Sequence, residues 1–353
     1  MAPADLRALA KIDLHCHVDG AARPGTLLEL AREAGLRLPG QTVEELLPHV
    51  RVPPGSRSLD DFLATFELFY PVLAVPGAMG RVARELVEDA AADGVIHLEA
   101  RFCPALQADV PGPARTRSGG RTPEDVLRET LAGLAAGAAA TGCSVGAIVC
   151  CYRSLDVAAN AELVRLALAH HGRGVVGLDL AGPERLAGAP VAALFARAHA
   201  AGLPITVHAG EAAGPESVRE AIDVLHARRL GHGVALARDA ALAATVAGRG
   251  IALECCLTSN LQTGAAPSLA GHPFDALRRA GLVVTLNTDD PAVCGTTLSA
   301  ELALAQRTWG DDLPALAALQ HAAAGAAFVE APRRAALHAA IEASLARCTA
   351  APG

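Results

Sequence analysis

Short apolar runs recur along the chain and alternate with longer segments that have helical spacing. Eight of these runs are rich in β-branched or other apolar residues, as expected of buried strands. They cover residues 11–17, 94–102, 144–152, 175–182, 204–210, 229–233, 251–258 and 283–291. Amphipathic segments lie between most of them, for example 26–36, 123–138, 191–202 and 217–228. Eight alternations of strand and helix predict an α/β fold, a (β/α)8 barrel.

No polar linker divides this pattern, so we expect a single domain over residues 1–353 with a barrel core at about 11–330. Two loop-like stretches, 39–58 and 111–122, interrupt early strand-to-helix connections. In a barrel these connections surround the mouth, so the pattern predicts extra helices and rim loops there.

Aromatic residues are concentrated just after the first of these loops. Four apolar side chains fall three or four positions apart on one face of a predicted helix: Leu59, Phe62, Phe66 and Phe69. The spacing fits a stripe that packs into the core equally well as a hydrophobic lid over a substrate. Phe62 and Phe66 are therefore candidate substrate contacts.

The composition narrows the class of protein. Hydrophobic residues make up 52% of the 353 positions and charged residues 19%, which supports a large core and argues against disorder. The 30 basic and 37 acidic side chains give a formal charge of −7. Because no clustered positive field accompanies this balance, we expect no nucleic-acid partner.

Targeting segments and cysteine usage indicate the cellular compartment. Residues 1–14 contain no apolar signal-peptide core, and the uncharged run 131–152 is mostly Ala and Gly, so we expect neither secretion nor a membrane span. The nine cysteines form no C-x-x-C motif and include the adjacent pairs Cys150–Cys151 and Cys255–Cys256. This reduced pattern is typical of a cytoplasmic protein. Oligomeric state leaves no signal in the sequence.

Candidate metal ligands lie at the ends of predicted strands. His15 and His17 end the first strand and, because strand side chains alternate, project to the same face. His208 ends the fifth strand, His232 the sixth and Asp289 the eighth. The carboxyl ends of barrel strands form one rim, and barrel enzymes carry their active sites there.

The donor types indicate which ion these residues would hold. Imidazole nitrogens with one carboxylate favour Zn2+, and iron or another divalent ion accepts the same donors. The carboxylate pair Asp289–Asp290 is costly to bury without a cation or a proton. Two-metal barrels usually carry a carboxylated lysine on the fourth strand, whereas the only lysine here is Lys11 on the first. We therefore expect one Zn2+ per chain.

Eight ordered motifs between about residues 11 and 291 resemble the adenosine deaminase family. They are KIDLHCHVDGAARPGTLLEL, SLDDFLATFELFYPVL, HLEARFCP, VVGLDLAGPE, TVHAGE, RLGHG, ECCLTSNLQTG and LNTDDP. The resemblance implies a zinc-dependent barrel hydrolase that removes the 6-amino group of a small purine nucleoside. Adenosine and 2′-deoxyadenosine are the implied substrates, with inosine and ammonia formed from adenosine.

The resemblance also implies roles for single residues. The implied metal ligands are His15, His17, His208 and Asp289. Glu211 corresponds to the donor of a proton to N1 of the purine, and His232 to the group that orients or deprotonates the water and stabilises developing charge. The implied substrate contacts are Asp290 at N7, the backbone N–H of Gly182 at N3, and Asp19 at a ribose hydroxyl.

Other interpretations remain open at this point. Adenine deaminases act on the free base, and a glutamate commonly stands there in place of Asp19. Arg115, Arg117 and Arg121 would suit an acidic 5′ extension, as in aminodeoxyfutalosine deaminases, if they faced the mouth. Cytidine-type zinc deaminases need a P-C-x-x-C motif, which is missing. A barrel that only binds or signals should have lost a ligand or the proton donor, and all are present.

Some of these residues also fit structural roles. Glu211 is placed to cap the following helix, and Asp289 and Asp290 precede a proline, as in an ordinary turn. Glu99 and Arg101 share one face of the second predicted strand, so we expect an internal ion pair between them.

Overall fold

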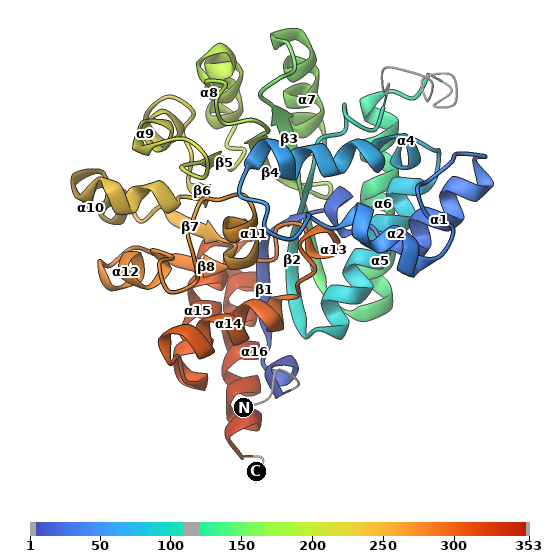
Figure 1. The fold of residues 1–353 in the computed structure, drawn as a ribbon. Coiled ribbons are helices and arrows are strands. Elements are labelled where there is room, and N and C mark those ends of the chain that lie inside the picture. The colour runs from blue at the N-terminus through green and yellow to red at the C-terminus, as the bar shows by residue number, and fades with distance from the viewer. Residues whose placement is uncertain (1–4, 109–119, 351–353) are drawn as a thin grey trace.

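The strands form a closed arrangement at the centre of the molecule. The computed structural model describes residues 5–108 and 120–350. Two four-stranded parallel sheets, ordered β1-β2-β3-β4 and β5-β6-β7-β8, are joined by the bridges Leu178–Ile205 and Cys16–Asp289. The predicted (β/α)8 barrel is confirmed, with helices around the strands (Figure 1). The strands are β1 (Lys11–His17), β2 (Val95–Phe102), β3 (Ser144–Tyr152), β4 (Val175–Ala181), β5 (Thr206–Ala209), β6 (Arg229–His232), β7 (Ala252–Cys255) and β8 (Val284–Leu286).

The helices fall into an outer layer and a set at the rim. The outer layer contains α5 (Ala78–Ala92), α6 (Pro123–Thr141), α7 (Val157–His170), α8 (Ala192–Ala200), α9 (Pro215–Asp223), α10 (Ala240–Gly248), α12 (Phe274–Arg279), α14 (Leu298–Trp309), α15 (Leu313–Ala326) and α16 (Ala331–Ala350). The additional helices are η2 (Asp19–Ala21), α1 (Pro24–Glu33), α2 (Val43–Val50), α3 (Leu59–Ala64), η3 (Thr65–Leu68), α4 (Tyr70–Leu73), α11 (Leu257–Gln262) and α13 (Pro291–Cys294). Within the described ranges, no helix combines the length and apolarity needed to cross a bilayer.

The seventh predicted strand is shorter than its apolar run. β7 ends at Cys255, and Leu257 begins α11 instead of continuing the strand to residue 258. Leu257 is nevertheless fully buried, while the next residue, Thr258, turns its hydroxyl toward the Glu301 carboxylate. The segment 251–258 is apolar because both the strand and the first residue of α11 are buried. Hydrophobicity alone therefore does not show where the strand ends and the helix begins.

A chain of buried charges fills the barrel below the rim. Arg229 lies between Glu99 (2.6 Å) and Glu254 (2.5 Å), and Arg101 lies between Glu254 (2.8 Å) and Asp179 (3.1 Å). All five side chains are at most 1% exposed. The predicted Glu99–Arg101 pair is therefore wrong. Residues two apart on one strand are separated along it by about 6.6 Å, whereas side chains from different strands converge on the barrel axis.

Candidate metal centre and active site

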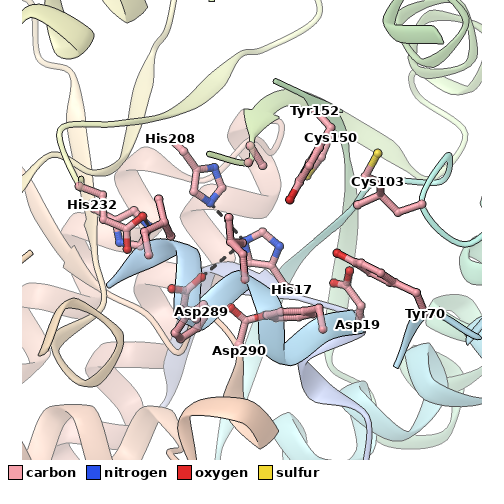
Figure 2. Close-up of a pocket in the computed structure, with 18 residues that line it drawn as sticks. His17, Asp19, Tyr70, Cys103, Cys150, Tyr152, His208, His232, Asp289 and Asp290 are labelled. Carbon is pink, nitrogen blue, oxygen red and sulfur yellow. Dashed lines mark hydrogen bonds and ion pairs between the residues drawn. The ribbon is translucent and has the colours of Figure 1, made fainter. Parts of the chain in front are cut away.

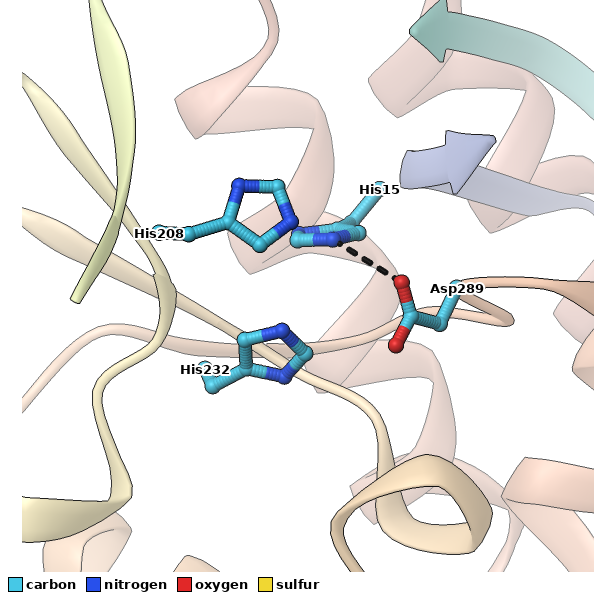
Figure 3. Close-up of side chains that lie close together, drawn as sticks. All are labelled: His15, His208, His232 and Asp289. Carbon is cyan, nitrogen blue, oxygen red and sulfur yellow. Dashed lines mark ion pairs between the residues drawn. The ribbon is translucent and has the colours of Figure 1, made fainter. Parts of the chain in front are cut away.

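Four side chains with metal-binding atoms meet at the carboxyl ends of the strands. His15 comes from β1, His208 from β5 and His232 from β6, while Asp289 follows β8. One donor atom of each lies within 4.8 Å of the donor atoms of the others, and all four residues are buried (Figure 3). Barrel closure thus places residues that are far apart in sequence within reach of one ion.

His17 lies against the same cluster (Figure 2). Its Nε2 is 3.2 Å from Nε2 of His208 and 3.4 Å from Oδ1 of Asp289. Nε2 of His15 is 3.1 Å from that same carboxylate oxygen. The structure therefore brings together all four predicted ligands, His15, His17, His208 and Asp289.

Two carboxylates orient the histidines from behind. His15 Nδ1 lies 2.9 Å from Oε2 of Glu254, and His208 Nδ1 lies 3.0 Å from Oδ2 of Asp179. Each carboxylate holds the ring proton on Nδ1 and leaves the Nε2 lone pair directed at the cluster. Nε2 of His15 is buried and forms no hydrogen bond, and Nε2 of His17 faces Nε2 of His208. Imidazole nitrogens and a carboxylate oxygen that converge in this way suit a divalent cation.

The strand ends adopt a backbone conformation that non-glycine residues rarely take. His232 has φ 65° and Asp289 has φ 61°, both in the left-handed region. Strain of this kind persists where the surrounding structure holds it, and it concentrates at functional sites. At both residues it turns the chain at the point where the side chain has to face the cluster.

Burial and neighbouring charges set different protonation states for the acids. Burial opposes ionisation of Asp289, but the imidazoles around it, His15 above all, hold its pKa well below the usual range. Burial raises the pKa of Glu211 well above its usual value, and the carboxylates of Asp289 and Glu184 raise it further. Burial and the Asp289 carboxylate also raise the pKa of Asp290. Burial therefore favours the protonated form of Glu211, whereas the surrounding imidazoles favour the ionised form of Asp289.

A cavity opens from the cluster toward the rim. It is lined by His17, Asp19, Leu59, Phe62, Leu63, Phe66, Tyr70, Cys103, Leu106, Cys150, Tyr152, Ala181, Gly182, His208, Glu211, His232, Asp289 and Asp290. Phe62 and Phe66 line it while Phe69 packs into the core, so the aromatic segment combines the two roles that its spacing allowed. Every predicted substrate contact faces this cavity.

Two of the acids that line the cavity have a buried carboxyl oxygen without a hydrogen-bond partner. Asp19 accepts a hydrogen bond from Gln107 Nε2 (3.1 Å) on one oxygen, while its other oxygen is buried without a partner. Burial raises the pKa of Asp19 to about 6. Asp290 likewise keeps Oδ1 buried and unpartnered. Buried polar atoms without partners indicate that a ligand completes their hydrogen bonds.

Comparison with known proteins gives the family. The family model for adenosine deaminase matches residues 10–344. The chain belongs to the adenosine deaminase family. An adenosine deaminase from Erwinia tasmaniensis is 39% identical over 328 residues, which cover 93% of this chain and 96% of that protein.

Solved structures of other family members have the same fold. Adenine deaminase from Arthrobacter aurescens matches with a TM-score of 0.85 and 27% identity, over 95% of this chain and 98% of that one. N6-methyl-AMP deaminase from Arabidopsis thaliana matches with a TM-score of 0.81 and 29% identity, over 97% and 98% of the two chains. These neighbours are named for a base and a nucleotide, so the fold alone does not choose the substrate.

Glu184 is a buried family-motif residue whose role the sequence reasoning missed. Its Oε2 accepts hydrogen bonds from three successive backbone N–H groups, at Glu211 (3.0 Å), Ala212 (2.6 Å) and Ala213 (2.7 Å). Its Oε1 accepts from the Gly210 N–H and the Ser217 hydroxyl. One carboxylate therefore anchors the loop that carries Glu211. The signal was its place in the DLAGPE motif, two residues after the predicted substrate contact Gly182.

Of the three arginines in the second rim loop, Arg121 lies in the part of the chain that the structure describes. Arg121 donates to the carbonyls of Ala74 (3.0 Å) and Val75 (3.2 Å) and pairs with Glu129 (2.5 Å). It thus caps the end of α4 and does not line the cavity. Arg115 and Arg117 lie outside the described residues.

Proposed function

We propose that the chain is a zinc-dependent adenosine deaminase that converts adenosine and 2′-deoxyadenosine to the 6-oxo nucleosides with release of ammonia. One observation carries this proposal: the buried carboxyl of Glu211 lines the same cavity as His17, His208 and Asp289, and the fourth donor, His15, lies directly behind them. Hydrolytic deamination of a purine needs both an activated water at C6 and a proton for the ring nitrogen N1.

The donors fit one divalent ion, and we propose zinc. His15, His17, His208 and Asp289 would hold it, which is one protein ligand more than catalytic zinc usually has. The fit rests on Nε2 of His15, which is buried without a hydrogen bond beside the Asp289 carboxylate, and on the close approach of the His17 and His208 nitrogens. When bound, such an ion lowers the pKa of a water toward neutrality.

The protein's own groups then have separate tasks. Glu211 gives its proton to N1 as electrons move onto the ring, and His232 contacts the attacking oxygen. Asp290, with its raised pKa, meets N7, and the Gly182 N–H meets N3. Gly182 has φ 97°, and a Cβ there would lie 2.9 Å from the Tyr152 ring, so a side chain is excluded.

Charge around the cavity favours a nucleoside over a nucleotide. Among the described residues that line it, no Lys or Arg is present, whereas the Asp19 carboxyl faces inward. A 5′-phosphate would therefore meet a negative group without a cation to balance it. A ribose hydroxyl, in contrast, supplies the donor that the free oxygen of Asp19 lacks.

A substrate panel tests the proposal. Purified protein of measured metal content is incubated separately with adenosine, 2′-deoxyadenosine, adenine, AMP and a 5′-carboxylated adenosine, and loss of the 6-amino chromophore is followed. We expect the highest kcat/KM for the two nucleosides. A preference for adenine or for an anionic substrate would overturn the substrate assignment. Undiminished turnover after exhaustive chelation would overturn the metal assignment.

Two broader features complete the proposal. We propose that residues 1–353 act as one hydrolase domain, in line with the family match over 10–344. We also propose a cytoplasmic location, which the nine free cysteines, eight of them buried, support.

A further inference from the structure

A row of three buried polar side chains connects the backbone at α12 to His232. The backbone N–H of Phe274 donates to Nδ1 of His272 (3.1 Å). Nε2 of His272 lies 3.1 Å from Oδ1 of Asn260, and Nδ2 of Asn260 lies 3.0 Å from Nδ1 of His232. Asn260 is 0%, His232 1% and His272 4% exposed, so water does not compete for these bonds.

The direction of every hydrogen bond in this row is fixed by its first member. A backbone N–H can only donate, so Nδ1 of His272 is an acceptor and carries no proton. Burial lowers the pKa of His272 to about 4, so the neutral ring has its proton on Nε2. That proton requires an oxygen, which places Oδ1 of Asn260 toward His272 and its NH2 group toward His232. The reversed amide would set two donors against each other.

The last step determines which nitrogen of His232 is protonated. Because Nδ1 accepts from Asn260, the proton of neutral His232 is on Nε2. Burial lowers the pKa of His232 well below its ordinary value, which keeps the ring neutral. Nε2 lies 3.5 Å from Oε2 of Glu211 and faces the cavity. His232 therefore presents an N–H to the site and has no lone pair directed at the cluster.

We propose that Asn260 and His272 are positioning residues that hold His232 as its Nε2–H tautomer, so that His232 donates a hydrogen bond to the oxygen attacking C6. In this state His232 is neither a metal ligand nor a base, although it lies within 4.8 Å of the other donors. The cluster of four thus separates into three ligands and one donor, with His17 as the remaining ligand. Accepting a proton at Nε2 would require the other tautomer, in which the Nδ1–H of His232 would face the NH2 group of Asn260.

Imidazole NMR tests the tautomer directly on the holoenzyme. The enzyme is labelled with 15N-histidine, and the His232 resonances are assigned by their loss in His232→Gln. We expect a pyrrole-type Nε2 and a pyridine-type Nδ1. A protonated Nδ1 with an unprotonated Nε2 would overturn the proposal. This measurement does not depend on activity, so it remains decisive if the proposed deaminase function fails.

Asn260→Asp tests the consequence for turnover, which rests on the proposed function. A carboxylate accepts from both histidines and moves the His232 proton to Nδ1, so the donor facing the cavity is lost. We expect kcat to fall about 100-fold, as for loss of one preorganised donor, with KM changed less than about threefold. Gln262→Leu, two residues along α11, removes a partly buried amide that donates to the Cys294 carbonyl and should leave kcat within about twofold.

Two outcomes of these kinetic experiments would contradict the proposal. Wild-type kcat in Asn260→Asp would show that the tautomer has no part in turnover. Loss of bound metal in His232→Gln would place His232 among the ligands, whereas we expect unchanged metal content. If wild-type enzyme deaminates none of the panel substrates, the proposed function fails while the NMR result still stands.

Discussion

Replacement of Glu184 by glutamine isolates the contribution of one buried carboxylate to the position of Glu211. The carboxylate accepts from five donors, three through Oε2 and two through Oε1. A glutamine keeps a single acceptor oxygen, so its NH2 group faces either the three loop N–H groups or the Gly210 N–H and Ser217 hydroxyl. Either orientation sets donors against donors in a buried place.

The expected size of the effect follows from these contacts. Each buried donor left without an acceptor costs about 1–3 kcal/mol, and Ser217 still accepts from Gly210 (2.8 Å), which relieves one of the two on that side. We therefore expect the variant to destabilise the loop conformation that places Glu211 by about 2–3 kcal/mol. Because a tenfold change in rate corresponds to about 1.4 kcal/mol, kcat for adenosine should fall by about 30- to 150-fold.

A double-mutant cycle distinguishes positioning of Glu211 from a general structural role. Kinetics of adenosine deamination, thermal unfolding and metal content are measured for Glu184→Gln, Glu211→Gln and the double variant. We expect Glu184→Gln to cost less than about threefold in kcat once Glu211 is already replaced. An equal loss in both backgrounds would refute the reasoning.

The matched control is another carboxylate that binds loop N–H groups. Glu220 accepts from Gly188 and Ala189, both at 2.8 Å, and lies outside the cavity. Glu220→Gln should lower thermal stability to a similar degree and leave kcat within about threefold. A larger loss of kcat there would mean that any loosened rim loop slows turnover.

Three further predictions concern the cluster and the substrate cavity. Glu211→Gln should keep its metal and lose about 100- to 10,000-fold in kcat, and wild-type-like rates in stopped assays would remove it as proton donor. Asp289→Ala should lose the metal while Asp290→Ala retains it, measured by elemental analysis of the purified proteins; full occupancy in Asp289→Ala would contradict the ligand assignment. Gly20→Ala puts a Cβ 1.8 Å from Oδ1 of Asp290 and should raise the KM for adenosine at least about tenfold by displacing that carboxyl, whereas Gly248→Ala, with nothing within 4 Å, should leave the KM unchanged. Equal KM values for the two glycine variants would exclude a substrate contact at Asp290.

The barrel and its rim were open to prediction because both follow from local patterns. Apolar runs and helical spacing mark the strands and helices, and parallel strands in a barrel bring their carboxyl ends together. His208 and Asp289 could therefore be expected near His15 without any knowledge of loop conformations. The resemblance to the family added which of these residues to group as ligands.

Partners across the barrel could not be predicted in the same way. Arg101 bonds to Glu254, 153 positions later, and the spacing along one strand pointed instead to Glu99. Which side chains meet on the axis depends on strand register and tilt, and neither leaves a signal in the residue pattern. The tautomer of His232 is likewise decided by Asn260 and His272, whose contacts exist only once α11 and α12 have packed.

The continuous series of opposite charges from Glu99 through Arg229, Glu254 and Arg101 to Asp179 restricts how this interior can diverge. Any single neutral replacement leaves a buried charge without its partner. The cost is about 3–5 kcal/mol of folding stability, which is a large part of the total stability of an ordinary protein. Substitutions are therefore tolerated only as compensated sets, and each set has to preserve the carboxylates behind His15 and His208. Sequence changes among these buried charges therefore affect the orientation of the histidines at the carboxyl ends of the strands. A redesign of the barrel interior would require a redesign of the active site as well.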